Sequence, residues 1–138
     1  MIPIFIGYDS AEPVAYHVLS HSIMRRATWP VSITPLKIEH LSDLFGRPAE
    51  ADQSTQFSYT RYLVPYLMGY QGWAVFMDCD MLVRADISDL WALKDDRWAI
   101  QCVQHDHKPE ETTKFLNRQQ VRYPRKNWSS VMLMNCNY

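Results

Sequence analysis

Residues 73–80 read WAVFMDCD, a run of five apolar residues that ends in two aspartates separated by one cysteine. An apolar run of this length that follows a glycine, here Gly72, is typical of a buried strand. Alternate side chains of an extended strand share a face, so we expect Asp78 and Asp80 to point the same way, with Cα atoms about 6.5 Å apart. The stretch therefore predicts a buried strand with two carboxylates at its tip.

The paired carboxylates indicate a metal site. Two close carboxylates repel each other and one pKa rises, whereas a divalent cation removes this penalty and keeps both ionised. Oxygen ligands favour Mg²⁺ or Mn²⁺ over zinc, and such ions usually keep open positions for substrate phosphates. We expect Asp78 and Asp80 to hold one such ion against a phosphate-bearing substrate. The alternative is an aspartate that only caps the turn after the strand.

Composition narrows the class of protein. A chain of 138 residues with 47% apolar residues predicts one domain, 1–138, with one core. The net charge of -1 gives no field for nucleic acid or an anionic membrane, and no apolar run approaches the roughly 20 residues of a membrane span. The first residues lack a basic leader, so we expect no signal peptide.

The three cysteines, Cys79, Cys102 and Cys136, show no C-x-x-C spacing. An odd number beside apolar segments favours free buried thiols in a reducing cytoplasm. A three-cysteine zinc site is the alternative. Likewise, His105 and His107 flank Asp106 and could bind metal, although a solvated strand end is the favoured interpretation.

Segments of strand and helix pattern alternate along the chain. Strands are predicted at 2–8, 31–38, 73–78, 98–103 and 131–134, and helices at 13–28, 58–70 and 112–120. A short turn is predicted at 88–91, where Ser88 or Asp89 can cap, and a long surface loop at 39–56. Several strands lack polar alternation, so we expect an α/β fold with a mostly parallel sheet covered by helices on both faces. Ligands of such sheets bind at the carboxyl ends of the strands. The residues predicted there are Asp9, Asp78, Asp80 and Gln104.

The predicted helix 58–70 carries an apolar and aromatic stripe that we expect to pack on the sheet, with Ser58 as its cap. The stripe consists of Tyr59, Tyr62, Leu63, Tyr66, Leu67 and Tyr70. Pro65 should kink the helix near Arg61, whose carbonyl would lose its partner. A cation in the first turn opposes the helix dipole, so Arg61 is a candidate phosphate contact, with a solvated surface arginine as the alternative.

The order of these motifs resembles the retaining glycosyltransferases of family 8, the group that includes glycogenin and bacterial lipopolysaccharide galactosyltransferases. The resemblance runs along most of the chain. It is carried by residues 4–9 (IFIGYD) with 20–23, by 57–67 (FSYTRYLVPYL), by 75–84 (VFMDCDMLVR) leading into 89–91, and by 128–135 (WSSVMLMN).

The resemblance implies a GT-A nucleotide-diphospho-sugar transferase fold, with Mn²⁺ held by Asp78 and Asp80 on either side of Cys79. It also implies a UDP-sugar donor, a carbohydrate acceptor and retention of configuration. By position, Tyr8 and Asp9 would hold uracil and ribose, and Arg61 would contact the diphosphate or the sugar. Gln104 stands where related enzymes often carry a carboxylate or amide near the donor sugar.

Two features depart from the family pattern. The family usually has Asn and Gly before its final strand, where this chain has Trp128, Ser129 and Ser130. Family members also continue for about as many residues again, which supply a third metal ligand, usually His, and much of the acceptor site. No part of this sequence matches that C-terminal acceptor part. Three interpretations are open: the chain is a fragment, a minimal variant, or part of a homo-oligomer that completes its site.

Two other functions compete with transfer. Residues 76–83 also look like the nucleophile motif of haloacid-dehalogenase phosphohydrolases, where Asp78 would be phosphorylated and Asp80 would act as acid and base. That motif normally lies on the first strand and needs a later lysine and acidic pair. A module that binds a nucleotide-sugar without transferring it is the second rival.

Overall fold

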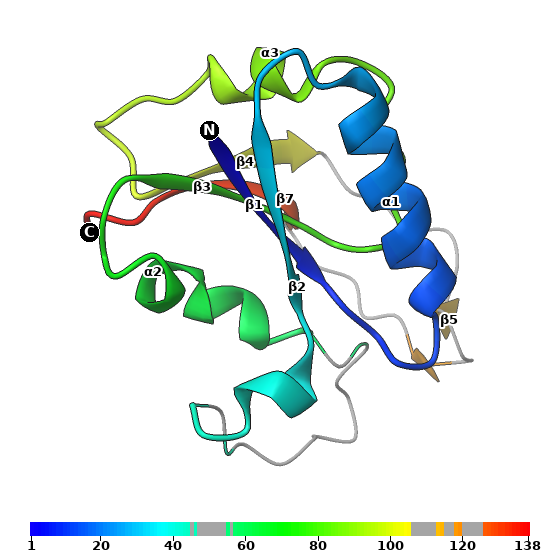
Figure 1. Ribbon diagram of the computed structural model, residues 1–138. Helices are drawn as coiled ribbons and strands as arrows, with labels where there is room; N and C mark the ends of the chain where they lie inside the picture. Colours follow the sequence, from blue (N-terminus) through cyan, green and yellow to red (C-terminus); the bar gives the residue numbers. More distant parts are fainter. Residues whose placement is uncertain (45, 47–54, 56, 106–112, 115–117, 120–125) are drawn as a thin grey trace.

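The computed structural model describes residues 1–44, 46, 55, 57–105, 113–114, 118–119 and 126–138 (Figure 1). Its main element is a five-stranded sheet in the order β2-β1-β3-β7-β4. The strands are β1 (Ile2–Gly7), β2 (Val31–Leu36), β3 (Trp73–Met77), β4 (Ile100–His105) and β7 (Lys126–Asn135). The predicted strands at 2–8, 31–38, 73–78, 98–103 and 131–134 correspond to these five, with β7 beginning earlier than expected.

The sheet is mostly parallel in direction. Strand β1 pairs in parallel with β2 and with β3, while β7 is antiparallel to both β3 and β4. Thus β2, β1, β3 and β4 share one direction and β7 runs against them. The carboxyl ends of β1 and β3 meet at one edge of the sheet, since Ile6 lies opposite Met77. Ser130 and Val131, midway along the antiparallel β7, lie at the same edge.

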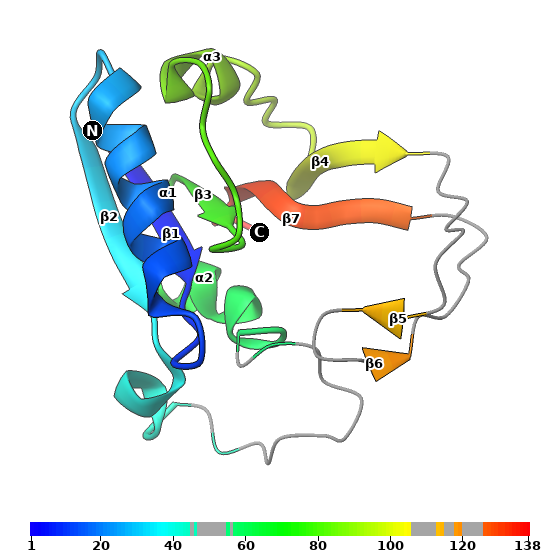
Figure 2. The ribbon, with the colours of Figure 1, turned by 90° about the vertical axis from the view of Figure 1, so that its right-hand side faces the viewer.

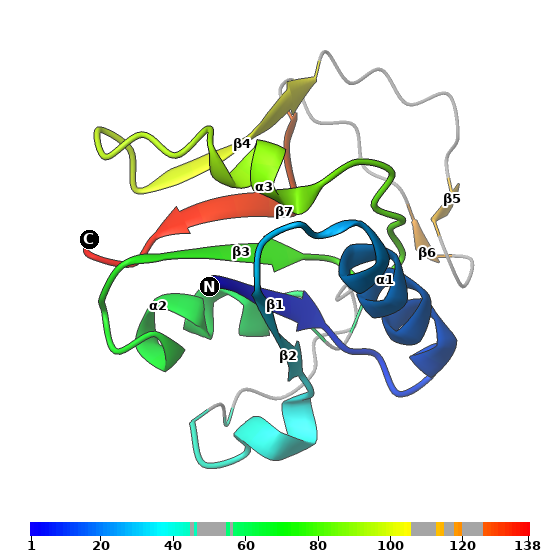
Figure 3. The same ribbon diagram turned by 45° about the horizontal axis from the view of Figure 1, so that its top comes forward.

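Helix α1 (Pro13–Arg26) follows β1 and packs on the sheet through its buried residues Leu19, Ser22 and Ile23. Pro13 suits its first turn because the missing N–H would have no helical partner there. Figures 1 and 3 show α1 and α2 (Val64–Leu67) on opposite sides of β1 and β3, so helical segments cover both faces. This is the α/β architecture predicted from the sequence.

A short helix, α3 (Ile87–Trp91), follows the segment that leaves β3. The Asp86 side chain caps it by accepting a hydrogen bond of 2.9 Å from the Ser88 N–H. The same carboxylate accepts hydrogen bonds from the backbone and hydroxyl of Thr28, in the turn after α1. Val83 N–H donates to Ser22 Oγ at 3.1 Å. These contacts fix the segment after Asp80 against α1.

The core lies between the sheet and these helices. Its largest fully buried side chains come mostly from β1, β3 and β7 and from the inner face of α1. They include Ile2, Ile4, Ile6, Leu19, Ile23, Val75, Phe76 and Met134. The central strands β1 and β3 are buried on both faces, which explains their unbroken apolar sequences.

The predicted helix 58–70 forms only in part. Residues Thr60–Leu63 make a 3₁₀ segment, η2, and only α2 is α-helical. Pro65 falls in the first turn of α2, and the Arg61 carbonyl accepts a 3₁₀-type bond from the Val64 N–H, so it keeps a partner. Ser58 is not the cap, because its hydroxyl donates to the Thr55 carbonyl instead.

The prediction that the tyrosines of this segment pack against the sheet is wrong. Tyr62, Tyr66 and Tyr70 are 61%, 49% and 59% exposed, whereas Thr60, Arg61 and Val64 face the interior. The 3₁₀ turn has three residues per turn rather than 3.6, so it rotates the predicted stripe away from the sheet.

Two further expectations differ from the structure. In place of a helix at 112–120, the described residues form two short antiparallel strands, β5 (Thr113–Lys114) and β6 (Arg118–Gln119), which Figure 2 shows as a pair separate from the main sheet. Cys79 and Cys136 are free and buried as predicted, but Cys102 is exposed on the edge strand β4. A 3₁₀ turn, η1 (Ile38–Leu41), begins the predicted loop, whose positions 45, 47–54 and 56 lie outside the described residues, as do Asp106 and His107.

Within the described ranges, no helix has the length and apolar character needed to cross a bilayer.

Candidate functional site

The Asp78-Cys79-Asp80 segment lies at the edge of the sheet where β1 and β3 end. The pairing of β3 with β7 continues one residue past Met77, because the Asp78 N–H donates to the Ser130 carbonyl at 2.8 Å. The Asp78 side chain is 19% exposed, Cys79 is buried and Asp80 is exposed. The cysteine thus points into the core and the two aspartates flank it at the rim.

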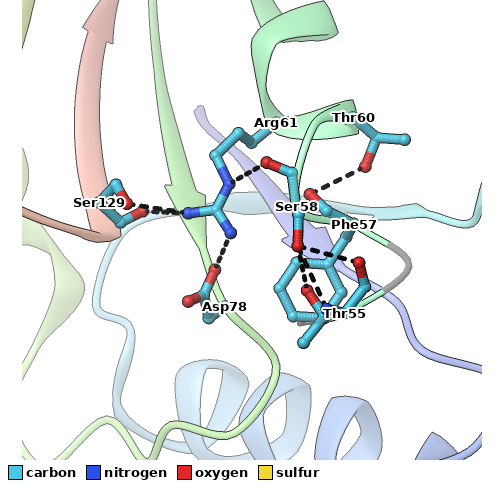
Figure 4. Close-up of polar contacts among 7 residues, drawn as sticks. All are labelled: Thr55, Phe57, Ser58, Thr60, Arg61, Asp78 and Ser129. Carbon is cyan, nitrogen blue, oxygen red and sulfur yellow. Dashed lines mark hydrogen bonds and ion pairs between the residues drawn. The ribbon is translucent and has the colours of Figure 1, made fainter. Parts of the chain in front are cut away.

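Arg61 is the cation of this site, and it is buried. Its Nη2 lies 3.1 Å from Asp78 Oδ1, and its Nε donates to the Ser58 carbonyl at 3.1 Å. Its Nη1 donates to the Ser129 carbonyl at 2.8 Å and to Ser129 Oγ at 3.2 Å (Figure 4). The guanidinium therefore joins η2, the tip of β3 and the middle of β7, rather than lying on a solvated surface.

Two phenylalanine rings enclose the guanidinium. Its Cζ lies 4.9 Å from the ring centroid of Phe76 and 5.8 Å from that of Phe57. Phe57 in turn lies against Gly7, where an added Cβ would come within 2.4 Å of the ring. Gly7 therefore leaves the space that the Phe57 ring fills, and the ring shields the Arg61 pair from water.

Burial raises the pKa of Asp78 from 3.8 to about 6. The Arg61 charge acts against this shift, the Asp80 carboxylate adds to it by repulsion, and hydrogen bonding to Ser130 opposes it weakly. The desolvation cost exceeds the help from Arg61, which is the usual balance for a buried carboxylate. Asp80 therefore lies close enough to Asp78 for the two charges to interact.

Cys79 contributes no metal-binding thiolate at neutral pH. Burial, followed by the charge of Asp80, raises the pKa of its thiol to about 11. The thiol is therefore protonated and packs in the core, and only the Cys79 backbone is left to contact a ligand.

The residues present fit a divalent cation. Asp78 Oδ1 is buried and makes no hydrogen bond, so its only described partner is the Arg61 charge, at a distance typical of an ion pair. Asp80 adds a second, exposed carboxylate, and the mutual repulsion is what a cation would relieve. Among the residues that the structure describes, at this site or elsewhere, no group of three or more His, Cys, Asp or Glu side chains is arranged to hold a metal ion.

The end of β1 supplies the neighbouring part of the same sheet edge. Tyr8 packs edge-to-face on Tyr16 at 5.5 Å, and Lys37 Nζ lies 5.8 Å from the Tyr8 ring centroid. Asp9 Oδ1 accepts a hydrogen bond of 2.9 Å from the Ala11 N–H and so fixes the turn into α1. Because β1 and β3 are parallel neighbours, Tyr8 and Asp9 lie on the same edge as Asp78.

Gln104 is placed differently. It is exposed on β4, which β7 separates from β3, and it lies opposite Asn127. Among the described residues, no hydrogen bond joins its side chain to Arg61 or to Asp78.

Sequence reasoning missed the role of two serines, Ser129 and Ser130, which lie within β7. Residues 128–130 stood out only as a departure from the family pattern, yet Ser129 holds Arg61 and Ser130 pairs with Asp78. The available signal was a pair of polar residues directly before the apolar run 131–134. The sequence did not indicate that this run is antiparallel and begins at the site.

The fold is that of glycosyltransferases. The chain matches the solved structure of the WbbM bifunctional glycosyltransferase, in its apo form, with a TM-score of 0.65 at 16% identity, over 98% of this chain and 31% of that one. It matches the apo form of the glycosyltransferase GlyE from Streptococcus pneumoniae TIGR4 with a TM-score of 0.58 at 17% identity, over 99% of this chain and 34% of that one. A second GlyE structure matches with a TM-score of 0.58 at 15% identity, over 99% of this chain and 35% of that one.

A curated relative is much closer in sequence. Protein CDI from Arabidopsis thaliana is 51% identical over 137 residues, which are 98% of this chain and 53% of the relative. The chain thus spans about half the length of that relative. No profile of a known protein family matches the sequence.

Proposed function

We propose that this chain is the donor-binding part of a metal-dependent glycosyltransferase that uses a nucleotide-diphosphate sugar, with UDP as the nucleotide. The observation that carries the proposal is the position of Asp78 and Asp80, two interacting carboxylates at the carboxyl end of a central strand in a glycosyltransferase fold. Retention of configuration follows only from the resemblance to family 8.

The chain's own residues take distinct roles in this proposal. Tyr8 and Asp9, at the end of β1, hold the nucleoside, and Asp78 and Asp80 hold Mn²⁺ or Mg²⁺. When bound, the ion supplies Lewis-acid stabilisation of the diphosphate leaving group. Gln104 is assigned to the donor sugar by the resemblance alone.

Arg61 acts mainly through Asp78. Every arm of its guanidinium has a partner in the structure, and the paired carboxylate is buried. Its positive charge favours the ionised form of Asp78, which is the form that binds a cation. Contact between Arg61 and a phosphate would require exchange of one of these partners, which a dianionic diphosphate can drive electrostatically.

The test is binding of UDP by calorimetry with and without Mn²⁺. We expect UDP to bind only with the metal and Asp80→Asn to abolish this binding while leaving the thermal unfolding unchanged, because Asp80 is exposed. Asp89→Asn, at an exposed acid on α3, is the matched control and should bind as the wild type does. Unchanged metal-dependent binding by Asp80→Asn would refute the assignment.

Transfer is tested separately from binding. Incubation with a panel of UDP-sugars should release UDP, by transfer or by slow hydrolysis, whereas a binding module would release none. The fold favours a transferase over the dehalogenase-type phosphohydrolase, since the solved structures that the chain resembles are glycosyltransferases. Turnover of p-nitrophenyl phosphate dependent on Asp78 would support the phosphohydrolase instead.

A further inference from the structure

A groove lined by tyrosines lies on the outer side of η2 and α2, the helical segments whose inner side carries Arg61. It encloses about 510 Å³, a volume typical of ligand pockets. We call it the tyrosine groove. Its lining residues are Asp43, Leu44, Tyr62, Leu63, Pro65, Tyr66, Tyr70 and Tyr138.

The tyrosine rings are presented to solvent rather than packed in the core. Tyr62, Tyr66, Tyr70 and Tyr138 are between 49% and 68% exposed. Four tyrosines gather around this one hollow, and a contiguous exposed aromatic patch is typical of a binding surface. The groove thus offers several flat apolar faces with polar edges.

The backbone fixes two of these rings in a defined arrangement. Tyr70 has a φ of 55°, in the left-handed region that a bulky residue rarely occupies, and its N–H donates to the Pro65 carbonyl at 2.8 Å. In this conformation its ring meets that of Tyr66 edge-to-face, with centroids 6.2 Å apart and planes at 86°. The two rings form a corner, which suits a ligand that touches two aromatic faces at an angle.

The polar groups of the groove match a polyhydroxylated ligand. The hydroxyls of Tyr62, Tyr66 and Tyr70 make no hydrogen bond to any described residue, so each can donate to and accept from a ligand. Asp43 is the charged residue among the described lining and acts only as an acceptor, and no basic side chain is among that lining. The charge of Asp43 therefore favours a neutral ligand over an anion.

Sugar rings meet these requirements. The C–H face of a pyranose stacks on an aromatic ring, and its hydroxyls donate to a carboxylate and exchange hydrogen bonds with tyrosine hydroxyls. A proline-rich peptide would also stack on tyrosines, but it presents mainly carbonyl acceptors, which Asp43 repels. We propose that the tyrosine groove binds a neutral oligosaccharide at a site separate from Asp78 and Asp80. The choice of a carbohydrate rests in part on the proposed transferase function.

The experiment measures binding of four neutral hexasaccharides, of maltose, cellulose, xylan and mannan type, by calorimetry and saturation-transfer NMR. We expect at least one to bind, and Tyr66→Ala and Tyr62→Ala each to weaken it at least tenfold. Tyr66→Phe, which keeps the ring, should lose only a few-fold. Trp29→Ala is the matched control, because Trp29 is 56% exposed outside the groove. Unchanged thermal unfolding of each variant shows that the fold is retained.

Three results would overturn the proposal: no hexasaccharide binding at millimolar concentration, binding that survives Tyr66→Ala, or binding of a proline-rich decapeptide in place of saccharides. UDP binding with Mn²⁺ is measured on the same samples. If wild-type protein binds UDP but no saccharide, the groove assignment fails alone. If it binds a saccharide through Tyr66 but no UDP, the donor-site proposal fails alone.

Discussion

Removal of Arg61 should reveal how strongly the structure depends on the pair that it forms with Asp78. At 3.1 Å, and with an effective dielectric constant of about 20, two unit charges attract by about 5 kcal/mol. Part of this attraction offsets the desolvation of Asp78, and the carboxylate can take up a proton when the cation is lost. We therefore expect Arg61→Ala to lower the free energy of unfolding by about 3 to 4 kcal/mol at pH 8.

The same substitution should cost less at pH 5. Asp78 has a pKa of about 6, so it is mostly neutral at pH 5 and the charge attraction is largely absent. The carbonyls of Ser58 and Ser129 still lose their donor, which leaves a loss of about 2 kcal/mol. The difference between the two pH values isolates the charge contribution.

The assay monitors urea unfolding by circular dichroism in the presence of a chelator. It compares the wild type, Arg61→Ala, Asp78→Asn and the double variant. The double-mutant cycle should give a coupling energy of about 2 kcal/mol at pH 8 and a smaller one at pH 5. Arg97→Ala is the matched control, since Arg97 forms its ion pair with Asp95 on the surface and should matter little. A coupling energy near zero at pH 8, or equal losses at both pH values, would refute the buried-pair reasoning.

Three further predictions concern the same region. Without metal, the unfolding free energy of the wild type should fall by about 3 kcal/mol as pH rises from about 4 to 6. The reason is that Asp78 keeps its proton to about pH 6 in the folded chain but releases it near pH 3.8 in the unfolded chain. Urea titrations at different pH values should show no such decrease for Asp78→Asn. Gly7→Ala should destabilise by about 1 to 3 kcal/mol, since its methyl group would meet the Phe57 ring, while Gly46→Ala, with open space around it, should unfold as the wild type does in the same assay. Ser129→Ala should cost about 1 kcal/mol, as it removes one of the two acceptors of Arg61 Nη1, and an unchanged urea midpoint would contradict this.

Much of the fold could be predicted because its strongest signals are local. The apolar runs at 2–6 and 73–77 lie in central strands buried on both faces, and Pro13 marks the start of α1. The position of Asp78 after β3 follows from the same run. Such signals depend on neighbouring residues alone.

The remaining features depend on contacts between distant residues. The Tyr62, Tyr66 and Tyr70 stripe has helical spacing, but the 3₁₀ turn at η2 directs it outward. Burial of Arg61 depends on Ser129, 68 positions along the chain, and local patterns carry no information about such a contact. The antiparallel direction of β7 is likewise a property of the assembled sheet.

Strand β7 follows Arg61 and Asp78 in the sequence, which has a consequence for the order in which the parts of the site form. Asp78 and Arg61 leave the ribosome well before Ser129 and Ser130, which supply hydrogen-bond partners to both. Until β7 is synthesised and inserted between β3 and β4, the Arg61–Asp78 pair lacks the hydrogen-bond partners that β7 supplies. Assembly of the Arg61–Asp78 site is therefore a late event that depends on long-range strand pairing, which is intrinsically slow.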